Sequence, residues 1–281
     1  MDRRTDSDQT SLHRTLTLPA RCWRHRGLLR QFTGRMVAEQ YRGSSLGALW
    51  MILSPLLMLA LYYLVFGVIF GGRFGVLPDE SRGDYALGIF FGLTLFQFVG
   101  GLLGQAPSLI VARPNFVKKV RVPVELIPLA ATLAAALPLL VSLLMVLAGQ
   151  FLVGRPPGIT ALVGLPLVLP PLLLLGLGLA WLLSGLGVFF RDLGPFSAFL
   201  SQALLYASAV FYRVEQAPVG LRPWLDLNPL VHVVEQGRRM VLWGFPPEPV
   251  ALVCLWLVSL LVAGVGAWVF LGLQRAFADV L

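Results

Sequence analysis

The chain has 281 residues, of which 57% are hydrophobic and 13% are charged, and its formal net charge is +8 at neutral pH. Soluble domains carry about 25% charged residues, so this composition and a mean hydropathy of +0.79 exclude a soluble domain. The apolar runs are continuous and rich in leucine, whereas the strands of a membrane barrel would alternate. The sequence therefore predicts an all-α integral membrane protein.

Residues 1–45 are polar and basic, and we expect them to form a cytoplasmic N-terminus. The basic opening is not followed by the apolar core of about 7–15 residues that marks a secretory signal peptide. Between Leu28 and Tyr41 four apolar residues share one sector of a helix, with arginines roughly opposite: Leu29, Phe32, Met36 and Val37. This pattern predicts an amphipathic helix along the inner leaflet, with its bases among anionic headgroups.

Six apolar runs follow within residues 46–273, at about 46–71, 86–111, 123–153, 160–190, 195–213 and 250–273. A helix of about 20 residues crosses the hydrocarbon layer, so these runs predict six transmembrane helices. The third and fourth runs contain prolines, which free backbone carbonyls inside a membrane helix: Pro138, Pro166, Pro170 and Pro171. No acidic residue lies deep inside any run, which argues against a transporter driven by protons or sodium ions.

Basic residues gather before the first run and in the loop 112–123 between the second and third runs. Cytoplasmic loops carry an excess of Lys and Arg, so both segments are expected in the cytoplasm. Six spans then return residues 274–281 to the same side. The positive charge is explained by membrane orientation, and nucleic acid is not an expected partner.

The segment from Asn115 to Pro128 is a short basic break with an apolar tip, Phe116-Val117. A loop that only joined two helices would gain nothing from presenting these side chains to the cytosol, so the pattern favours docking into a groove of another protein. The alternative is an interfacial loop whose apolar residues dip into lipid. Glu125 is expected to pair with the neighbouring bases and to fix the loop: Lys118, Lys119 and Arg121.

The segment 214–249 is too polar to cross the bilayer and too apolar for a plain loop, and its prolines divide it into short helices. Apolar residues on one side (Leu230, Val233, Val234) oppose polar ones on the other (Glu235, Arg238, Arg239). We expect a re-entrant or interfacial helical hairpin on the external face, because irregular backbone at membrane depth must contact protein or water. His232 is expected to be an interfacial histidine with satisfied hydrogen bonds.

No motif for catalysis or metal binding stands out. The two cysteines, Cys22 and Cys254, lie in the N-terminal segment and the last run, and the three histidines are scattered. No Gly-rich phosphate loop with a lysine is present. We therefore expect neither an enzyme nor a metal or cofactor bound by this chain.

Four segments resemble, in the same order, the polysaccharide-export permeases of ABC type 2 transporters. They are Tyr41–Trp50 with Ser54-Pro55, Asn115–Pro128, Phe190–Leu193, and Asn228–Leu230 with Arg238 and Arg239 downstream. The resemblance runs from about residue 28 to the end of the chain. One departure is Ala209, which stands where the family has proline in a Ser-Pro-Val ending to the fifth span.

The resemblance implies a homodimer in the bacterial inner membrane, with a separate ATPase subunit that binds ATP and Mg beneath each copy. A lipid-linked or lipid-anchored glycan would pass between the copies, and O-antigen, capsule and teichoic acid all stay open as substrates. The loop after the second span becomes the ATPase-coupling segment: Asn115, Phe116, Val117, Lys118, Lys119, Arg121 and Glu125. The external segment becomes a gate: Asn228, Pro229, His232, Arg238 and Arg239.

A path for sugars needs flat aromatic platforms and a few polar groups, by analogy with the stacking of bases on aromatic side chains. Two stripes at helical spacing fit, on the first and fifth runs: Tyr62, Phe66, Phe70 and Phe199, Gln202, Tyr206. Ordinary packing is the alternative for each aromatic, whereas the Gln202 amide favours a stripe that faces protein or water.

Two other classes of function stay open. A secondary transporter would move substrate without a partner ATPase, driven by an ion gradient. A membrane enzyme of lipid or sugar transfer would need a metal-binding aspartate motif, which we do not find.

Overall fold

The computed structural model describes residue 15 and residues 17–114, 116 and 123–281, and the regular structure within these ranges is helical. Five of the described segments are long and apolar enough to cross a membrane. They are the run formed by η1 (Gly47–Leu49), α3 (Trp50–Tyr62) and η2 (Tyr63–Ile69), then α4 (Arg82–Gln105), α7 (Leu126–Leu152), α8 (Ile159–Gly187), and α12 (Pro249–Leu273) with its C-terminal extension. An all-helical integral membrane protein is therefore confirmed.

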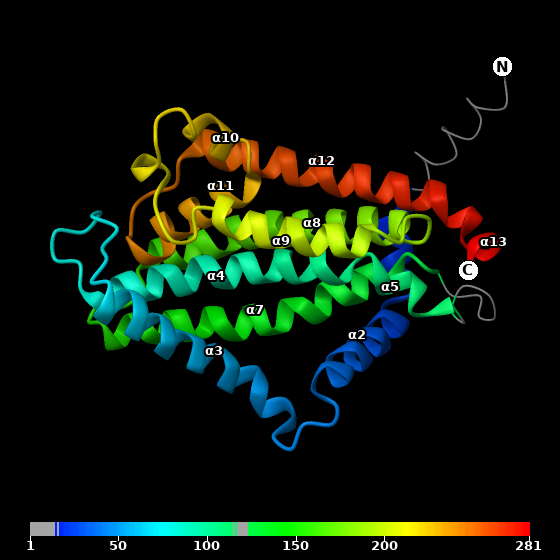
Figure 1. Cartoon of the computed structure of the whole chain (residues 1–281), viewed down its shortest axis with the longest axis horizontal. Coiled ribbons are helices and arrows are strands. Elements are labelled where there is room, and N and C mark those ends of the chain that lie inside the picture. The colour runs from blue at the N-terminus through cyan, green and yellow to red at the C-terminus, as the bar shows by residue number, and fades with distance from the viewer. Residues whose placement is uncertain (1–14, 16, 115, 117–122) are drawn as a thin grey trace.

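The shorter described elements lie around these helices. They are α2 (Arg26–Tyr41), α5 (Ser108–Val111), α9 (Leu193–Ala207), η3 (Val214–Gln216), α10 (Arg222–Asp226), α11 (Pro229–Gly237), η4 (Arg238–Leu242), η5 (Gln274–Ala276) and α13 (Phe277–Val280). Figure 1 shows α4, α7, α8, α9 and α12 running side by side, with α10 and α11 at one end and α5 and α13 at the other. Helices α2 and α3 leave this bundle as the two arms of a V.

Helix α9 occupies the place of the fifth expected run but has only 15 residues. At about 1.5 Å per residue it is about 22 Å long, less than the roughly 30 Å of the hydrocarbon layer. The chain turns directly after it, where Ala209 has φ 51°. Proline is fixed near −65°, so the turn seen here depends on a residue other than proline at this position.

Helices α8 and α12 approach each other at glycines. A Cβ atom on Gly178 would lie 2.5 Å from the carbonyl oxygen of Val262, and one on Gly266 would lie 2.1 Å from the carbonyl oxygen of Gly178. Since lipid gives helices little hydrophobic reason to associate, small residues that let backbones touch are a main source of packing energy in membranes. This contact joins the last long helix to the bundle.

One of the prolines of α8, Pro171, leaves a carbonyl that another helix satisfies. Pro171 has no N–H for the carbonyl of Leu167, four residues earlier. The indole Nε1 of Trp256 on α12 donates to that carbonyl at 3.1 Å. The proline thus frees a backbone carbonyl, as the sequence predicted, and the neighbouring helix supplies the donor for it.

At the end of the bundle that holds α10 and α11, the side chain of Arg238 is fully buried. Its Nε donates to the carbonyl of Gly88 at 2.9 Å, and its Nη1 donates to the carbonyl of Ala209 at 2.8 Å. Further carbonyl acceptors are those of Tyr212 and Val210. The guanidinium therefore joins α4, η4 and the turn after α9.

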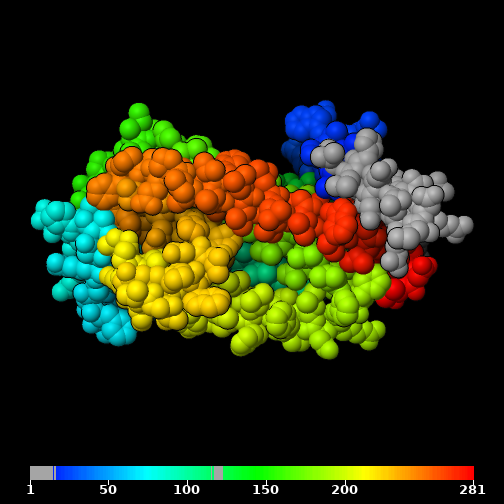
Figure 2. Space-filling model, turned by 90° about the horizontal axis from the view of Figure 1, so that it is seen from above, coloured from blue at the N-terminus to red at the C-terminus, as the bar shows by residue number. Residues whose placement is uncertain are grey.

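Aromatic packing closes the same cluster. The guanidinium carbon of Arg238 lies 4.5 Å from the ring centre of Phe74, which belongs to the connection between η2 and α4. Glu80 fixes this connection, because its carboxylate accepts from the N–H groups of Phe74 and Gly75 at 2.8 and 2.7 Å. Figure 2 shows this connection (cyan) and the segment after α9 (yellow) gathered at one end of the molecule.

The sequence pattern placed Arg238 with Glu235 and Arg239 opposite the apolar side of this segment, and for Arg238 this expectation is wrong. The buried face of α11 includes Leu230, Val233 and Val234, as expected. Arg238 is buried as well, because the π-helical turn η4 begins at this residue and carbonyls from α4 and from the turn after α9 surround its side chain. Burial lowers the pKa of Arg238 to about 9, which leaves the guanidinium charged at neutral pH.

We predict that Arg238→Met lowers stability strongly and that Arg239→Met does not. The first change leaves several buried carbonyls without a donor, at about 1–3 kcal/mol for each. Arg239 makes a half-exposed ion pair with Glu248 at 3.1 Å, and such pairs contribute about 0–1 kcal/mol. Both variants lose one positive charge at adjacent positions, so the melting temperature and yield of the detergent-solubilised protein compare them directly. Equal losses of melting temperature and yield in the two variants would contradict the structural role given to Arg238.

Candidate functional site

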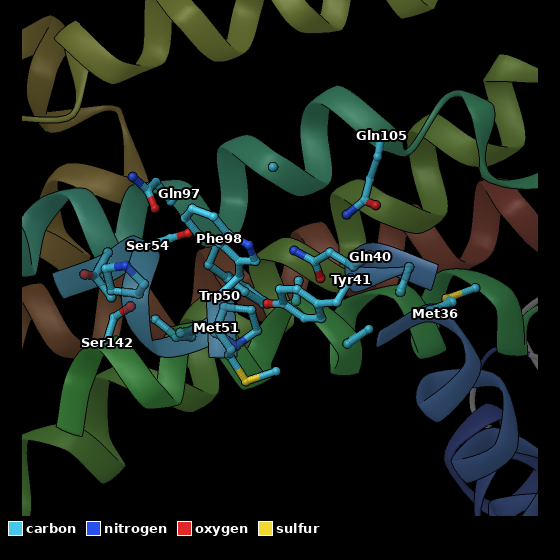
Figure 3. Close-up of a pocket in the computed structure, with 18 of the residues that line it drawn as sticks. Met36, Gln40, Tyr41, Trp50, Met51, Ser54, Gln97, Phe98, Gln105 and Ser142 are labelled. Atoms are coloured by element: carbon cyan, nitrogen blue, oxygen red, sulfur yellow. The ribbon is translucent and has the colours of Figure 1, made fainter. Parts of the chain in front are cut away.

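A groove of about 680 Å³ lies between α2, α3, α4 and α7, inside the V that α2 and α3 form in Figure 1, whose open side faces the bundle. We call this space the groove. Its lining combines apolar residues with amides, hydroxyls and one ion pair. Figure 3 labels ten of the residues that line the groove: Met36, Gln40, Tyr41, Trp50, Met51, Ser54, Gln97, Phe98, Gln105 and Ser142.

One wall of the groove is a polar stripe on α4. From Ala86 to Gly100 every residue of this helix is buried except Gln97, which is exposed. Gly101 and Gln105 follow on the same face and are exposed too. A Cβ atom on Gly101 would meet nothing within 4 Å, so packing inside the chain does not require glycine there. Sequence analysis missed this stripe, although a glutamine in the middle of an apolar run was its signal.

The opposite wall is one face of α3, formed by Trp50, Ser54 and Met58. The same four-residue spacing continues to Tyr62, Phe66 and Phe70, the stripe predicted from the sequence. The ring centres of Tyr62 and Phe66 are 6.1 Å apart, and those of Phe66 and Phe70 are 5.8 Å apart. The second half of this run is the π-helix η2, whose wider turn keeps residues four apart close to one face.

Phe211 joins the two aromatic stripes that the sequence predicted separately. Its ring stacks on Phe66 at 5.5 Å between centres and lies 6.2 Å from the ring of Tyr206. We call Tyr62, Phe66, Phe70, Phe211 and Tyr206 the aromatic ladder. Phe211 was not among the predicted residues, because it lies in the turn after α9, outside the helical spacing.

The remaining residues of the second stripe lie on an exposed face of α9. Phe199 is 71% exposed and Tyr206 is 61% exposed, and Gln202 between them is exposed as well. The three therefore share one face, as their spacing predicted, and contribute little to the core of the chain. Their contact with a sugar stays a prediction.

The mouth of the groove holds an ion-pair cluster. Glu39 on α2 accepts from Arg35 at 3.0 Å and from Arg113, beyond α5, at 3.2 Å. The hydrogen bond from Arg35 lowers the pKa of the Glu39 carboxyl, although some burial acts in the opposite direction. The carboxylate is thus ionised at neutral pH and compensates Arg113.

In the predicted coupling segment, Asn115, Val117, Lys118, Lys119 and Arg121 lie outside the described residues. Phe116 is described and half-buried, and its ring meets Phe32 of α2 edge-on at 5.2 Å between centres. Phe116 therefore contacts α2, the helix expected to be amphipathic. Sequence reasoning did not foresee this contact.

Glu125 is almost fully buried, and its carboxylate pairs with Arg21 at 2.5 Å. Gln274 in η5 donates to the same carboxylate at 3.2 Å, and the Trp181 indole of α8 donates to the Glu125 backbone carbonyl at 3.2 Å. The partners expected from the sequence lie outside the described residues. The described ones tie the start of α7 to the N-terminal segment and to the end of α12.

The predicted gate residues hold the short helices α10 and α11 in place. Asn228 caps α11: its Oδ1 accepts from the Leu230 N–H at 3.0 Å, and its Nδ2 donates to the Ala207 carbonyl at 2.9 Å. Pro229 fills the first position of that helix, where a missing N–H costs nothing. His232 lies 2.7 Å from the carbonyl of Asp226, and Arg239 donates to the carbonyl of Pro246 at 2.7 Å.

Within the part of the chain that the structure describes, no group of three or more His, Cys, Asp or Glu side chains could hold a metal ion. What the described site offers is a groove with polar and aromatic walls, an aromatic ladder at one end and an ion-pair cluster at the other. Such an arrangement suits the passage or binding of an elongated polar molecule.

A family model described as ABC-2 type transporter matches residues 28–242 of the chain. An O-antigen export system permease protein, RfbA, from Klebsiella pneumoniae is 25% identical over 90% of this chain and 95% of its own length. RfbA of Myxococcus xanthus is 26% identical over 92% and 96%, and the polysialic acid transport protein KpsM of Escherichia coli is 25% identical over 83% and 88%. The family match covers most of the helical bundle, including the groove and the aromatic ladder, and the chain therefore belongs to the ABC-2 type transporter family.

Proposed function

We propose that this chain is the membrane permease subunit of an ATP-driven exporter that moves a lipid-linked or lipid-anchored polysaccharide across the bacterial inner membrane. The observation that carries the proposal is the family match over residues 28–242, together with relatives that are named for O-antigen export or polysialic acid transport and align over most of their length. The groove and the aromatic ladder agree with it, because both present groups that suit sugars.

In the proposed topology the chain crosses the membrane six times, with α9 as the short fifth span and α2 along the inner leaflet. Both termini are cytoplasmic, and residues 214–249 form the external re-entrant segment. The opposite placement of α10 and α11 relative to α5 and α13 supports this arrangement (Figure 1). The buried face of α11 also supports it, since a re-entrant helix must contact protein.

Two copies of the chain would enclose the glycan path, and each would contact one ATPase subunit through the loop 112–123. The exposed faces of α3 and α9 support a second copy: α3 contains no buried residue, and the described part of α9 buries only Ser197. ATP and Mg would bind to the partner. A secondary transporter remains the alternative that the experiments below separate.

The direct test is deletion of the gene in the native bacterium, followed by complementation. Loss of surface polysaccharide with accumulation of the glycan inside the cell is expected, and the same result is expected when the partner ATPase is inactivated. The chemical identity of the accumulated glycan would decide between O-antigen, capsule and teichoic acid. Normal surface polysaccharide in the deletion strain would overturn the proposal.

We expect Tyr62→Ala and Tyr206→Ala to slow export more than they reduce the amount of folded protein. Tyr206 is mostly exposed, so little packing is lost at that position. Phe270→Ala is the control, because Phe270 is fully buried and its ring packs 5.4 Å from that of Phe277, away from the ladder, and truncating a core aromatic costs about 3–5 kcal/mol. Export is measured per folded transporter. If Tyr62→Ala and Tyr206→Ala lowered the yield but kept normal export per folded molecule, the two tyrosines would serve packing alone.

We expect Phe116→Asp to abolish co-purification with the ATPase, since a charge would enter an apolar docking groove. The same change also breaks the contact with Phe32. Phe32→Ala removes that contact and leaves the loop unchanged, and this variant should retain the ATPase. Equal loss in both variants would mean that the loop acts through α2, and retention in both would remove Phe116 from the docking surface.

A further inference from the structure

The groove has a polar wall at a depth where lipid would leave it unpaired. Gln97 lies two thirds of the way along α4, and it is exposed in a stretch whose other residues are buried. Transfer of an amide from water to an apolar medium without a partner costs several kcal/mol, about 4–8 against cyclohexane. Lipid chains alone are therefore a poor filling for the groove, and water or a polar ligand is favoured.

The charges around the groove restrict the chemistry of that ligand. Its lining includes two charged side chains, Glu39 and Arg113, which pair with each other at 3.2 Å, whereas Arg35, the second partner of Glu39, does not line the groove. A phosphate would need a cation that is not already neutralised. Among the described lining residues the other polar groups are neutral, so the lining provides no dedicated site for a charged headgroup.

Neutral amides and hydroxyls suit sugars. Each amide both donates and accepts, and each hydroxyl does the same, which matches the vicinal hydroxyls of a saccharide. The groove presents such side chains from four helices, among them Gln40, Ser54, Gln97, Gln105 and Ser142. Trp50 and Tyr41 add flat aromatic faces in the same space (Figure 3).

The groove is also continuous with the aromatic ladder. Trp50, Ser54 and Met58 line it from α3, and the same face of that run continues at four-residue spacing into Tyr62 and Phe66. On the α4 wall, Gly101 leaves open space, since a Cβ atom on it would meet nothing within 4 Å. A chain molecule lying along α3 would therefore pass from amides to aromatic rings without leaving one helix face.

We infer that the groove within each subunit, between α2, α3, α4 and α7, binds uncharged sugar residues of the exported polysaccharide before they reach the aromatic ladder. This inference rests on the proposed function. It assigns direct sugar contact to Gln97, Gln105 and Ser54, and it assigns no headgroup phosphate to the groove.

Cysteine labelling in inverted membrane vesicles tests the inference with the full chain and its ATPase. Cys22 and Cys254 are first replaced by serine, and single cysteines are introduced by Gln97→Cys and by the nearly isosteric Ser54→Cys. Leu57→Cys is the matched control, because Leu57 lies on α3 less than one turn from Ser54, is 53% exposed and does not line the groove. A water-soluble maleimide is applied to vesicles that contain the polymerised glycan, to vesicles in which glycan assembly is blocked and only the lipid carrier is present, and to proteoliposomes that contain neither.

We expect positions 54 and 97 to be labelled without glycan and to react several-fold more slowly with it, while position 57 stays unlabelled. Absence of labelling without glycan would mean that lipid or a second copy fills the groove, and equal labelling in both vesicles would place the sugar elsewhere. Protection by the lipid carrier alone would make the groove a binding site for the headgroup of that carrier. Each of these results overturns the inference. Export by the same variants is measured in parallel, so failure of the groove is distinguished from absence of export by the unmodified chain, which would overturn the proposed function.

Discussion

The buried guanidinium of Arg238 is the interaction on which the arrangement at one end of the molecule depends. It binds carbonyls from α4 and from the turn after α9, and it lies over the ring of Phe74. A buried charge is tolerated only when hydrogen bonds replace water, so three segments far apart in sequence must keep their positions together. Phe211 lies in the turn that this cluster holds, and its ring links Phe66 to Tyr206. The aromatic ladder is thus positioned by the same cluster.

The opposite end of the molecule is organised by carboxylates. Glu125 joins the start of α7 to Arg21 and Gln274, while Glu39 joins α2 to Arg113. The loop proposed to contact the ATPase lies between Arg113 and Glu125. A force applied to that loop would therefore reach α2, α7 and the end of α12 through short polar contacts, whereas the groove and the ladder lie along α3 and α4 between the two ends. This arrangement agrees with a transporter that is driven from one side of the membrane and releases its substrate on the other side.

Much of the fold could be predicted from the sequence, because helices in lipid must satisfy their own backbone and so appear as long apolar runs. The bounds of α7, α8 and α12 lie close to the expected ones, and Leu230, Val233 and Val234 are buried as their spacing indicated. Contacts between distant segments could not be predicted, since nothing local in the sequence distinguishes Arg238, which is buried, from Arg239, which is not. The polar stripe of α4 was missed for a related reason: Gln97 becomes informative only when its neighbours are known to be buried. The length of α9 also depends on a local turn at Ala209 that composition does not reveal.

ATP-driven movement of a glycan is the central claim, and reconstitution of the chain with its partner ATPase in proteoliposomes tests it most directly. The quantity to measure is transfer of a labelled lipid-linked polysaccharide across the bilayer. Transfer is expected to require ATP and an active ATPase, and to continue when ionophores collapse all ion gradients. Transfer by the chain alone under a proton or sodium gradient, without the ATPase, would contradict the account and identify a secondary transporter.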